Sequence, residues 1–140
     1  MSDIIEKIGR LRNLMTMIGC SDEQITNAQK TLDMVFPQEY VTYMREFGSI
    51  CFFGHEFTGL GWCRNGNENI GDRNVVTLTL QERELNDDFP PKMLALENAG
   101  IDGIIITVDE SGAVYKVQYD ECTKLCDSFS DYIDRFLNED

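Results

Sequence analysis

The chain has few of the residues on which catalysis usually depends. Among its 140 residues there is a single histidine, His55. A catalytic thiol such as Cys51 or Cys63 would have to meet His55, with an orienting group behind the pair. Cys51 and His55 fall on a predicted strand and turn, where their side chains need not meet. We therefore predict that the protein is not an enzyme, and that His55 is a half-exposed residue at a strand end.

Metal and cofactor motifs are lacking as well. Cys122 and Cys126 are four residues apart, without the two-residue spacer that is typical of structural zinc sites. We interpret them as small apolar side chains packed under the last helix. Short glycine spacings at 59–61 and 65–66 are not followed by the lysine of a phosphate-binding loop. We predict no metal site and no cofactor.

Positive charge is scarce. Twelve basic residues face 25 acidic ones, which gives a formal net charge of −13. Residues 51–140 hold eighteen of the acidic and seven of the basic side chains. Direct contact with nucleic acid or an anionic membrane is disfavoured, because both need a basic surface. The negative charge serves either solubility or attraction to a basic partner, such as an enzyme that acts on nucleic acid.

Long apolar runs and an export signal are also lacking. No run reaches the length that crosses a bilayer, and the start Met1-Ser2-Asp3 is acidic where a secretory signal is basic. The five cysteines have no framework spacing, so we expect reduced thiols and a cytoplasmic location. The length suits one domain over residues 1–140.

The clearest local pattern that is present is a short helix between Pro37 and Gly48. Proline is tolerated at the first helical position, and glycine is suited to the left-handed conformation that ends a helix. The residues that form one apolar face at helical spacing are Tyr40, Tyr43, Met44 and Phe47. Such a short helix is unstable alone, so this face must pack against the rest of the fold.

Further helices are predicted for residues 4–18, 21–35, about 77–85 and 128–137. The first has an apolar stripe from Ile4 to Ile18 and ends at Gly19. The second begins with a capping box of Ser21 and Gln24. Predicted strands cover residues 50–53, 56–60, 93–96, 103–108 and 113–119. Because the helices and strands are segregated, we predict an α+β fold, with a mixed, mostly antiparallel sheet flanked by N-terminal helices and a C-terminal helix.

The polar segment 61–73 is rich in Gly and Asn and has no clear period, which is typical of functional loops. It contains the only tryptophan, Trp62, which either anchors an interface or packs over the sheet. We predict that partner binding involves Trp62, Glu68, Asp72, Asp87 and Asp88.

Several short motifs follow one another in a specific order. They are Phe36-Pro37-x-Glu39-Tyr40, Phe47-Gly48-Ser49, Phe53-Gly54-x-Glu56-x-x-Gly59-Leu60, Asn74-Val75-Val76, Asp109-x-x-Gly112 and Ser128-Phe129-x-x-Tyr132-Ile133. Over about residues 20–137 this order resembles the SUKH superfamily, which includes fungal cell-wall synthesis regulators and many bacterial immunity proteins. The resemblance implies that the signature residues determine the fold and are not contacts: Phe36, Pro37, Tyr40, Phe47, Gly48 and Gly59.

The resemblance also implies a function without catalysis. Bacterial members of the superfamily bind and neutralise polymorphic toxins, often nucleases. We therefore predict an immunity protein that inhibits a cognate toxin stoichiometrically, with a basic nuclease domain as its partner. The alternative is a regulatory or scaffold module of the cell-wall regulator type. Such modules usually lie within longer chains, whereas little is expected here outside the domain. The oligomeric state is not predicted.

Overall fold

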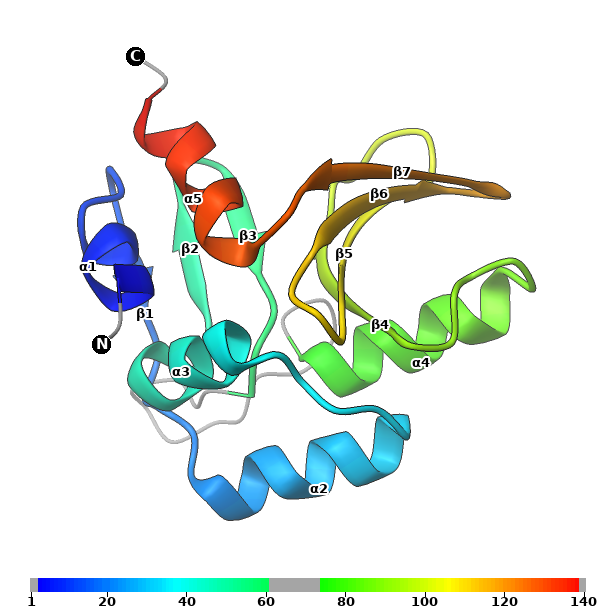
Figure 1. Ribbon diagram of the computed structural model, residues 1–140, viewed down its shortest axis with the longest axis horizontal. Coiled ribbons are helices and arrows are strands. Elements are labelled where there is room, and N and C mark those ends of the chain that lie inside the picture. The colour runs from blue at the N-terminus through cyan, green and yellow to red at the C-terminus, as the bar shows by residue number, and fades with distance from the viewer. Residues whose placement is uncertain (1–2, 61–73, 139–140) are drawn as a thin grey trace.

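The computed structural model describes residues 3–60 and 74–138 (Figure 1). Within these ranges the helices are α1 (Asp3–Gly9), α2 (Asp22–Leu32), α3 (Gln38–Phe47), α4 (Val75–Leu85) and α5 (Phe129–Leu137). The strands are β1 (Met15–Thr16), β2 (Ile50–Phe52), β3 (His55–Phe57), β4 (Met93–Asn98), β5 (Ile104–Asp109), β6 (Val114–Gln118) and β7 (Glu121–Cys126). The predicted α+β class is confirmed.

The strands form two antiparallel sheets, where the sequence predicted one mixed sheet. The first has the order β1-β2-β3 and the second the order β4-β5-β6-β7. The sheets are joined where the chain leaves β3, because the N–H of Thr58 donates to the carbonyl oxygen of Leu96 at 2.7 Å. The parallel pairing that was expected is reduced to one isolated bridge between Gly59 and Asn74.

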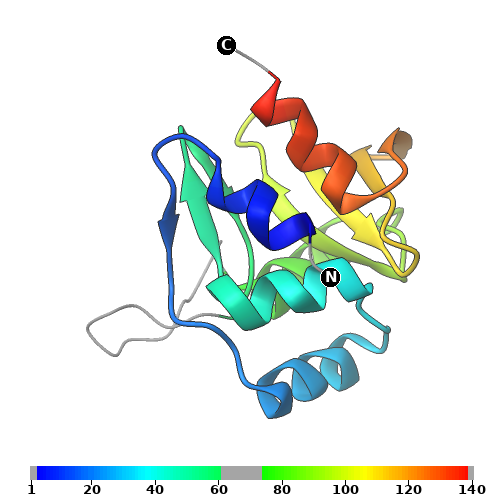
Figure 2. The same cartoon turned by 60° about the vertical axis from the view of Figure 1, so that its left-hand side comes forward.

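Three helices cover one face of the first sheet. Figure 2 shows α1, α3 and α5 on the same side of β2 and β3. The aromatic side chains of Tyr40, Tyr43, Phe57 and Phe129 meet there and are fully buried. Phe129 packs edge-on against Tyr43 with ring centroids 5.5 Å apart. The apolar face predicted for the short helix is therefore the centre of the main core.

The two ends of α3 use the residues that the sequence indicated. Pro37 occupies the N-cap, one position before the helix, and Gly48 ends the helix with φ of 76°. Gly59 lies against Gly48 so closely that a Cβ on Gly59 would be 1.7 Å from the Gly48 carbonyl oxygen. Because that neighbour is backbone, only glycine fits at position 59 without a shift of the chain.

The predicted helix over 4–18 is wrong beyond Gly9. Asn13 has a left-handed backbone with φ of 59°, and Met15 then pairs with Cys51 as strand β1. Ile18 is half exposed, so the apolar stripe stops contributing to the core after Leu11. Gly19 serves a close approach and not a helix end, since a Cβ there would lie 2.0 Å from the carbonyl oxygen of Arg45.

The remaining helices are close to prediction. The capping box of Ser21 and Gln24 is present in α2, although Val35 lies beyond the helix and is exposed. Helix α4 begins two residues earlier than expected, at Val75, because the Asn74 side chain accepts hydrogen bonds from the first turn. No helix in residues 3–60 or 74–138 has the length and apolar character to span a bilayer.

Strand β7 was not predicted, because its first four residues are exposed and polar or small. It forms one edge of the second sheet and pairs with β6. Cys122 is exposed on this strand, so it does not pack under the last helix as we expected, whereas Cys126 is half-buried against the main core. One face of the second sheet contributes to the main core. Its other face packs against α4 through a smaller cluster that includes Leu78, Ile105 and Val117.

Candidate protein-binding surface

The structure describes two of the five residues predicted to bind a partner. Asp87 and Asp88 are exposed in the loop between α4 and β4. Trp62, Glu68 and Asp72 lie outside the described residues. The candidate surface therefore has to be built outward from Asp87 and Asp88.

Three connections meet at the end of the molecule that carries these two aspartates. The Asn86 side-chain amide, before β4, donates to the carbonyl oxygen of Tyr119 in the β6–β7 turn at 2.9 Å. The Gln118 amide donates to the carbonyl oxygen of Asp102 in the β4–β5 loop at 3.0 Å. These hydrogen bonds hold the α4–β4, β4–β5 and β6–β7 connections side by side.

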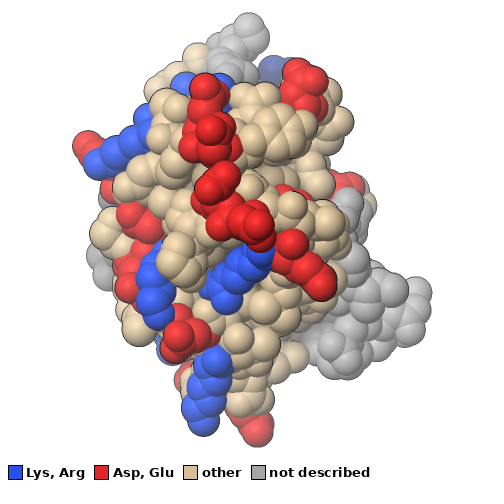
Figure 3. Space-filling view, turned by 90° about the vertical axis from the view of Figure 1, so that its right-hand side faces the viewer, with Lys and Arg blue, Asp and Glu red and all other residues tan. Residues whose placement is uncertain are grey.

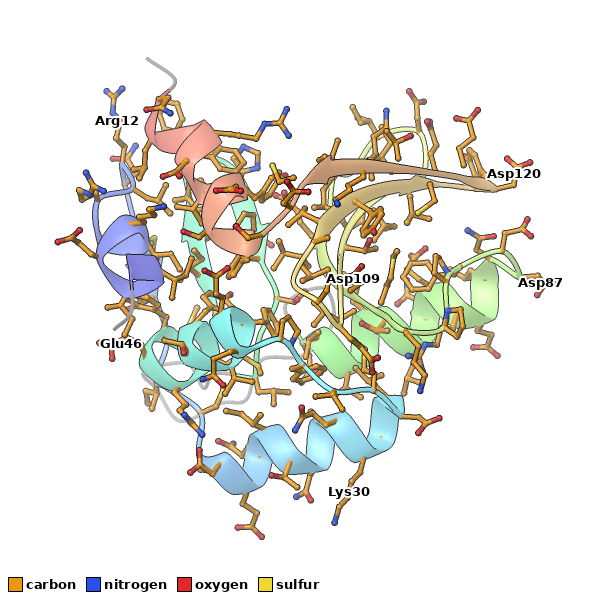
Figure 4. All side chains as sticks on the ribbon, viewed as in Figure 1. Arg12, Lys30, Glu46, Asp87, Asp109 and Asp120 are labelled. Atoms are coloured by element: carbon orange, nitrogen blue, oxygen red, sulfur yellow. The ribbon has the colours of Figure 1, made fainter. Side chains whose placement is uncertain are left out.

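This arrangement gathers five exposed carboxylates, which we call the acidic end: Asp87, Asp88, Asp102, Asp120 and Glu121. None of the five forms an ion pair with any residue in the described part of the chain. Figure 4 shows Asp87 and Asp120 projecting from the same end of the molecule, and Figure 3 faces this end, with acidic side chains in a band across it. The negative charges therefore reinforce one another and remain available to a partner.

Each of the three connections also exposes a large apolar side chain. Leu85 is 72% exposed, and Ile101 and Tyr119 are each 63% exposed. Leu85 ends α4, Ile101 lies in the β4–β5 loop and Tyr119 in the β6–β7 turn, so each connection contributes one. Exposed apolar groups surrounded by polar ones are typical of protein interfaces.

Tyr119 is held in an unusual backbone conformation. Gln118 pairs with Glu121, which leaves Tyr119 and Asp120 as a two-residue hairpin turn. Tyr119 has φ of 56°, at a turn position that glycine usually occupies. Its ring covers Gly103 so closely that a Cβ there would be 2.8 Å from the ring. Packing and the Asn86 hydrogen bond thus maintain a strained residue whose side chain is largely exposed.

Sequence reasoning missed Tyr119 as a candidate contact. It was assigned to the alternating pattern of residues 113–119, and without β7 the following turn could not be recognised. A signal was present: a tyrosine is followed directly by the carboxylates Asp120 and Glu121, which favours a turn exposing all three.

The described residues do not assemble a cysteine–histidine pair. Phe52 lies opposite His55 and Cys51 opposite Glu56, so Cys51 and His55 project from opposite faces of the sheet. The Nδ1 of His55 instead contacts the Glu97 carboxylate at 3.0 Å. Burial raises the pKa of Glu97, and His55 opposes that rise. His55 is half-exposed at the start of β3, as the sequence predicted.

The other ionisable groups of the core do not form a reactive site. Burial raises the pKa of the Cys20 thiol to about 11, which keeps it protonated and unreactive at neutral pH. Burial also holds the pKa of Tyr40 well above its usual range. Within the described ranges, no group of three or more His, Cys, Asp or Glu side chains is placed to hold a metal ion.

Comparison with known families gives a match over most of the chain. Residues 19–135 match the model of the SMI1 / KNR4 family (SUKH-1). The chain belongs to this family. The resemblance seen in the sequence is therefore confirmed, and SUKH membership supports an immunity role or a related role in protein interaction. SUKH proteins are generally not catalytic. No curated protein matches the chain.

The SUKH match includes both α3 and the acidic end, but it begins after α1 and β1. The signature residues Tyr40, Gly48 and Gly59 are buried within the shared part of the fold. The acidic end, in contrast, lies on its surface.

Proposed function

We propose that this SUKH protein is an immunity protein, and that it neutralises a cognate toxin by binding it through the acidic end. The observation that carries this proposal is the gathering of five exposed carboxylates, none of which forms an ion pair with a described residue, at the end that also exposes Leu85, Ile101 and Tyr119. A toxin domain that acts on nucleic acid needs a basic surface for its own substrate. Such a surface is complementary in charge to the acidic end.

The two kinds of side chain at the acidic end have different roles in this mechanism. The carboxylates accelerate encounter with a basic partner, because opposite charges steer association. The ring of Tyr119 and the side chains of Leu85 and Ile101 then lose exposed surface on contact, which slows dissociation. Trp62, Glu68 and Asp72 remain predicted contacts. Inhibition needs only occlusion of the toxin surface, so no catalytic group is required.

The alternative, a regulatory or scaffold module, uses the same capacity to bind proteins. It differs in the identity of the partner and in the effect of binding. We favour the immunity function because the unpaired charge suits a basic nuclease domain. We further propose that the chain acts in the cytoplasm, as one domain over residues 1–140.

The test begins with capture of partners from the native cell by the full chain. Each toxin-like protein recovered is then expressed in a sensitive host, with and without this chain. The proposal predicts that co-expression restores growth and that the purified proteins form a one-to-one complex. A recovered toxin that kills equally in the presence of the chain would refute the immunity function, and a stable complex with a non-toxic protein would favour the regulatory alternative.

A further inference from the structure

A small pocket lies away from the acidic end, between the α1–β1 connection, the β2–β3 hairpin and the end of α5. Its volume is about 150 Å³. Phe52, Phe53 and Phe136 contribute aromatic walls, and the ring of Phe136 lies edge-on to Phe52 with centroids 5.2 Å apart. We call it the aromatic pocket. In Figure 4, Arg12 on its border and Asp120 of the acidic end lie on opposite sides of the molecule.

The border of the aromatic pocket is positively charged, in contrast to the protein as a whole. Arg10 and Arg12 line it and are both exposed. Neither forms an ion pair with a described residue, although the chain has 25 acidic side chains. The Arg12 guanidinium lies over the Phe53 ring, 5.7 Å from its centroid. Two cationic donors are thus available beside an aromatic wall.

The carboxylate of Glu97, which lies beside the pocket residue His55, already has hydrogen-bond partners. Glu97 is only 7% exposed, and its carboxylate contacts His55 Nδ1 at 3.0 Å. It also accepts the N–H of Glu56 at 3.2 Å. His55 in turn stacks on Phe52, with centroids 5.2 Å apart. These contacts fix the His55 ring as a wall of the pocket and leave Arg10 and Arg12 without competition from Glu97.

Phe53 has a positive φ, a backbone conformation that is unfavourable for a bulky side chain. Phe52 pairs with His55, so Phe53 and Gly54 form a two-residue turn, with φ of 46° and 88°. Positive φ at both central positions is the requirement of a type I′ turn, where Asn-Gly is the preferred sequence. Phe53 is nevertheless 68% exposed, so its ring adds little to the core. The ring instead contacts the Arg12 guanidinium and forms part of the wall of the aromatic pocket.

We propose that the aromatic pocket binds a carboxylate that carries one aromatic ring. A cavity near 150 Å³ holds a molecule the size of benzene. The ring would lie among Phe52, Phe53 and Phe136, and the carboxylate would accept hydrogen bonds from Arg10 and Arg12, since guanidinium groups pair with carboxylates in bidentate geometry. This site is independent of the proposed toxin binding. Its ligand is either a free aromatic acid or the C-terminal residue of a peptide, which share this chemistry.

Titration of the isotope-labelled full chain by NMR tests the site with defined probes. The probe for a free acid is 3-phenylpropanoate, and the probe for a peptide C-terminus is N-acetylphenylalanine. We expect saturable shifts at Arg10, Arg12, Phe53 and His55, with a Kd on the order of 1 mM. N-acetylphenylalaninamide, which has the ring but no charge, should bind about tenfold more weakly. Tighter binding of N-acetylphenylalanine than of 3-phenylpropanoate would identify a peptide terminus, and the reverse order a free acid.

Three variants separate binding in the pocket from general electrostatic attraction. Arg12→Gln should weaken binding of the acids about tenfold, whereas Arg45→Gln, on α3, removes the same charge elsewhere and should leave the Kd unchanged. Phe53→Asn creates the favoured Asn-Gly turn, so the hairpin folds while the ring is lost, and binding should also fall about tenfold. The proposal is overturned by the absence of saturable shifts with both acids, by equal affinity for the amide, or by equal effects of Arg12→Gln and Arg45→Gln.

Discussion

The tips of the β2–β3 and β6–β7 hairpins are alike in length and in their first residue, and they differ in surroundings. Each is a two-residue turn that begins with an exposed aromatic residue at positive φ, Phe53 or Tyr119. Phe53 lies beside Arg10 and Arg12, and Tyr119 lies at the end that carries the five carboxylates; none of these charged groups forms an ion pair within residues 3–60 and 74–138. Because an exposed aromatic residue with positive φ begins both turns, but in opposite charge environments, we infer that the two tips recognise different partners: a small anion at Phe53 and a basic protein surface at Tyr119.

Both tips depend on the buried core of the fold that carries them. Tyr40 is fully buried, and its hydroxyl donates to the carbonyl oxygen of Thr58 at 3.1 Å. Tyr40→Ala should lower the free energy of unfolding by about 3–5 kcal/mol, since it removes a buried aromatic ring. Tyr40→Phe, which loses the hydroxyl alone, should cost about 1 kcal/mol. Denaturant unfolding measures both. A stable Tyr40→Ala protein that no longer binds the partner would break the division between scaffold and surface.

The same substitution at each tip sharpens the comparison. Tyr119→Asn keeps a residue that tolerates positive φ and removes only the ring. We expect binding of the protein partner to weaken by about 2 kcal/mol, or roughly thirtyfold, with little loss of stability. Calorimetry with the captured partner measures the affinity. The affinity for 3-phenylpropanoate should not change, and a variant that loses both ligands would show that the tips are not independent.

Asp109 provides a carboxylate with a structural role, unlike those of the acidic end. Burial disfavours its charge, but hydrogen bonds from Ser111, Tyr115 and Ala113 outweigh burial and lower its pKa. Its ionised form therefore stabilises the native state above the unfolded pKa near 4, and this contribution is lost as the pH falls through the lower native pKa. Asp109→Ala should cost about 1 kcal/mol at neutral pH.

Acid titration of stability tests the role of the Asp109 charge. The difference between wild type and Asp109→Ala should shrink as the pH falls below about 4, because the wild-type carboxyl then becomes protonated. At neutral pH, Asp120→Ala, which removes an exposed carboxylate, should change stability less than Asp109→Ala does. A difference for Asp109→Ala that is constant down to acid pH would contradict the role of the charge.

Phe53→Asn should give a small gain in stability. Relief of the strained backbone should raise the free energy of unfolding by up to about 1 kcal/mol. Thermal unfolding measures the gain, and binding of the protein partner should be unchanged. A large loss of stability would show that the Phe53 ring belongs to the core after all.

The helices that the sequence predicted best are those in which the capping residues and the spacing of apolar residues indicate the same boundaries. Helix α3 was recognised because Pro37, Gly48 and the apolar spacing agree, and the cap of α5 by Ser128 is present as expected. The break after Gly9 could not be predicted, because the apolar stripe continues to Ile18 while β1 depends on pairing with a strand 36 positions later, at Cys51. Non-local pairing of this kind is absent from local periodicity.

The sequence predicted that the candidate surface is acidic, but not all of the residues that form it. Asp87 and Asp88, which follow the predicted helix over 77–85, are exposed as binding residues must be. Asp102, Asp120 and Glu121 come from two other connections, and only the fold brings them to the same end through Asn86 and Gln118.

The most direct test measures the rate of association with the captured toxin for two variants. Each variant replaces two acidic residues by lysine, at different places on the surface. One variant combines Asp87→Lys and Asp120→Lys at the acidic end. The other combines Glu46→Lys, which Figure 4 places across the molecule from that end, with Glu23→Lys on α2. At low salt we predict that the first lowers the association rate about tenfold or more and that the second changes it far less. Equal reductions by both would contradict binding through the acidic end.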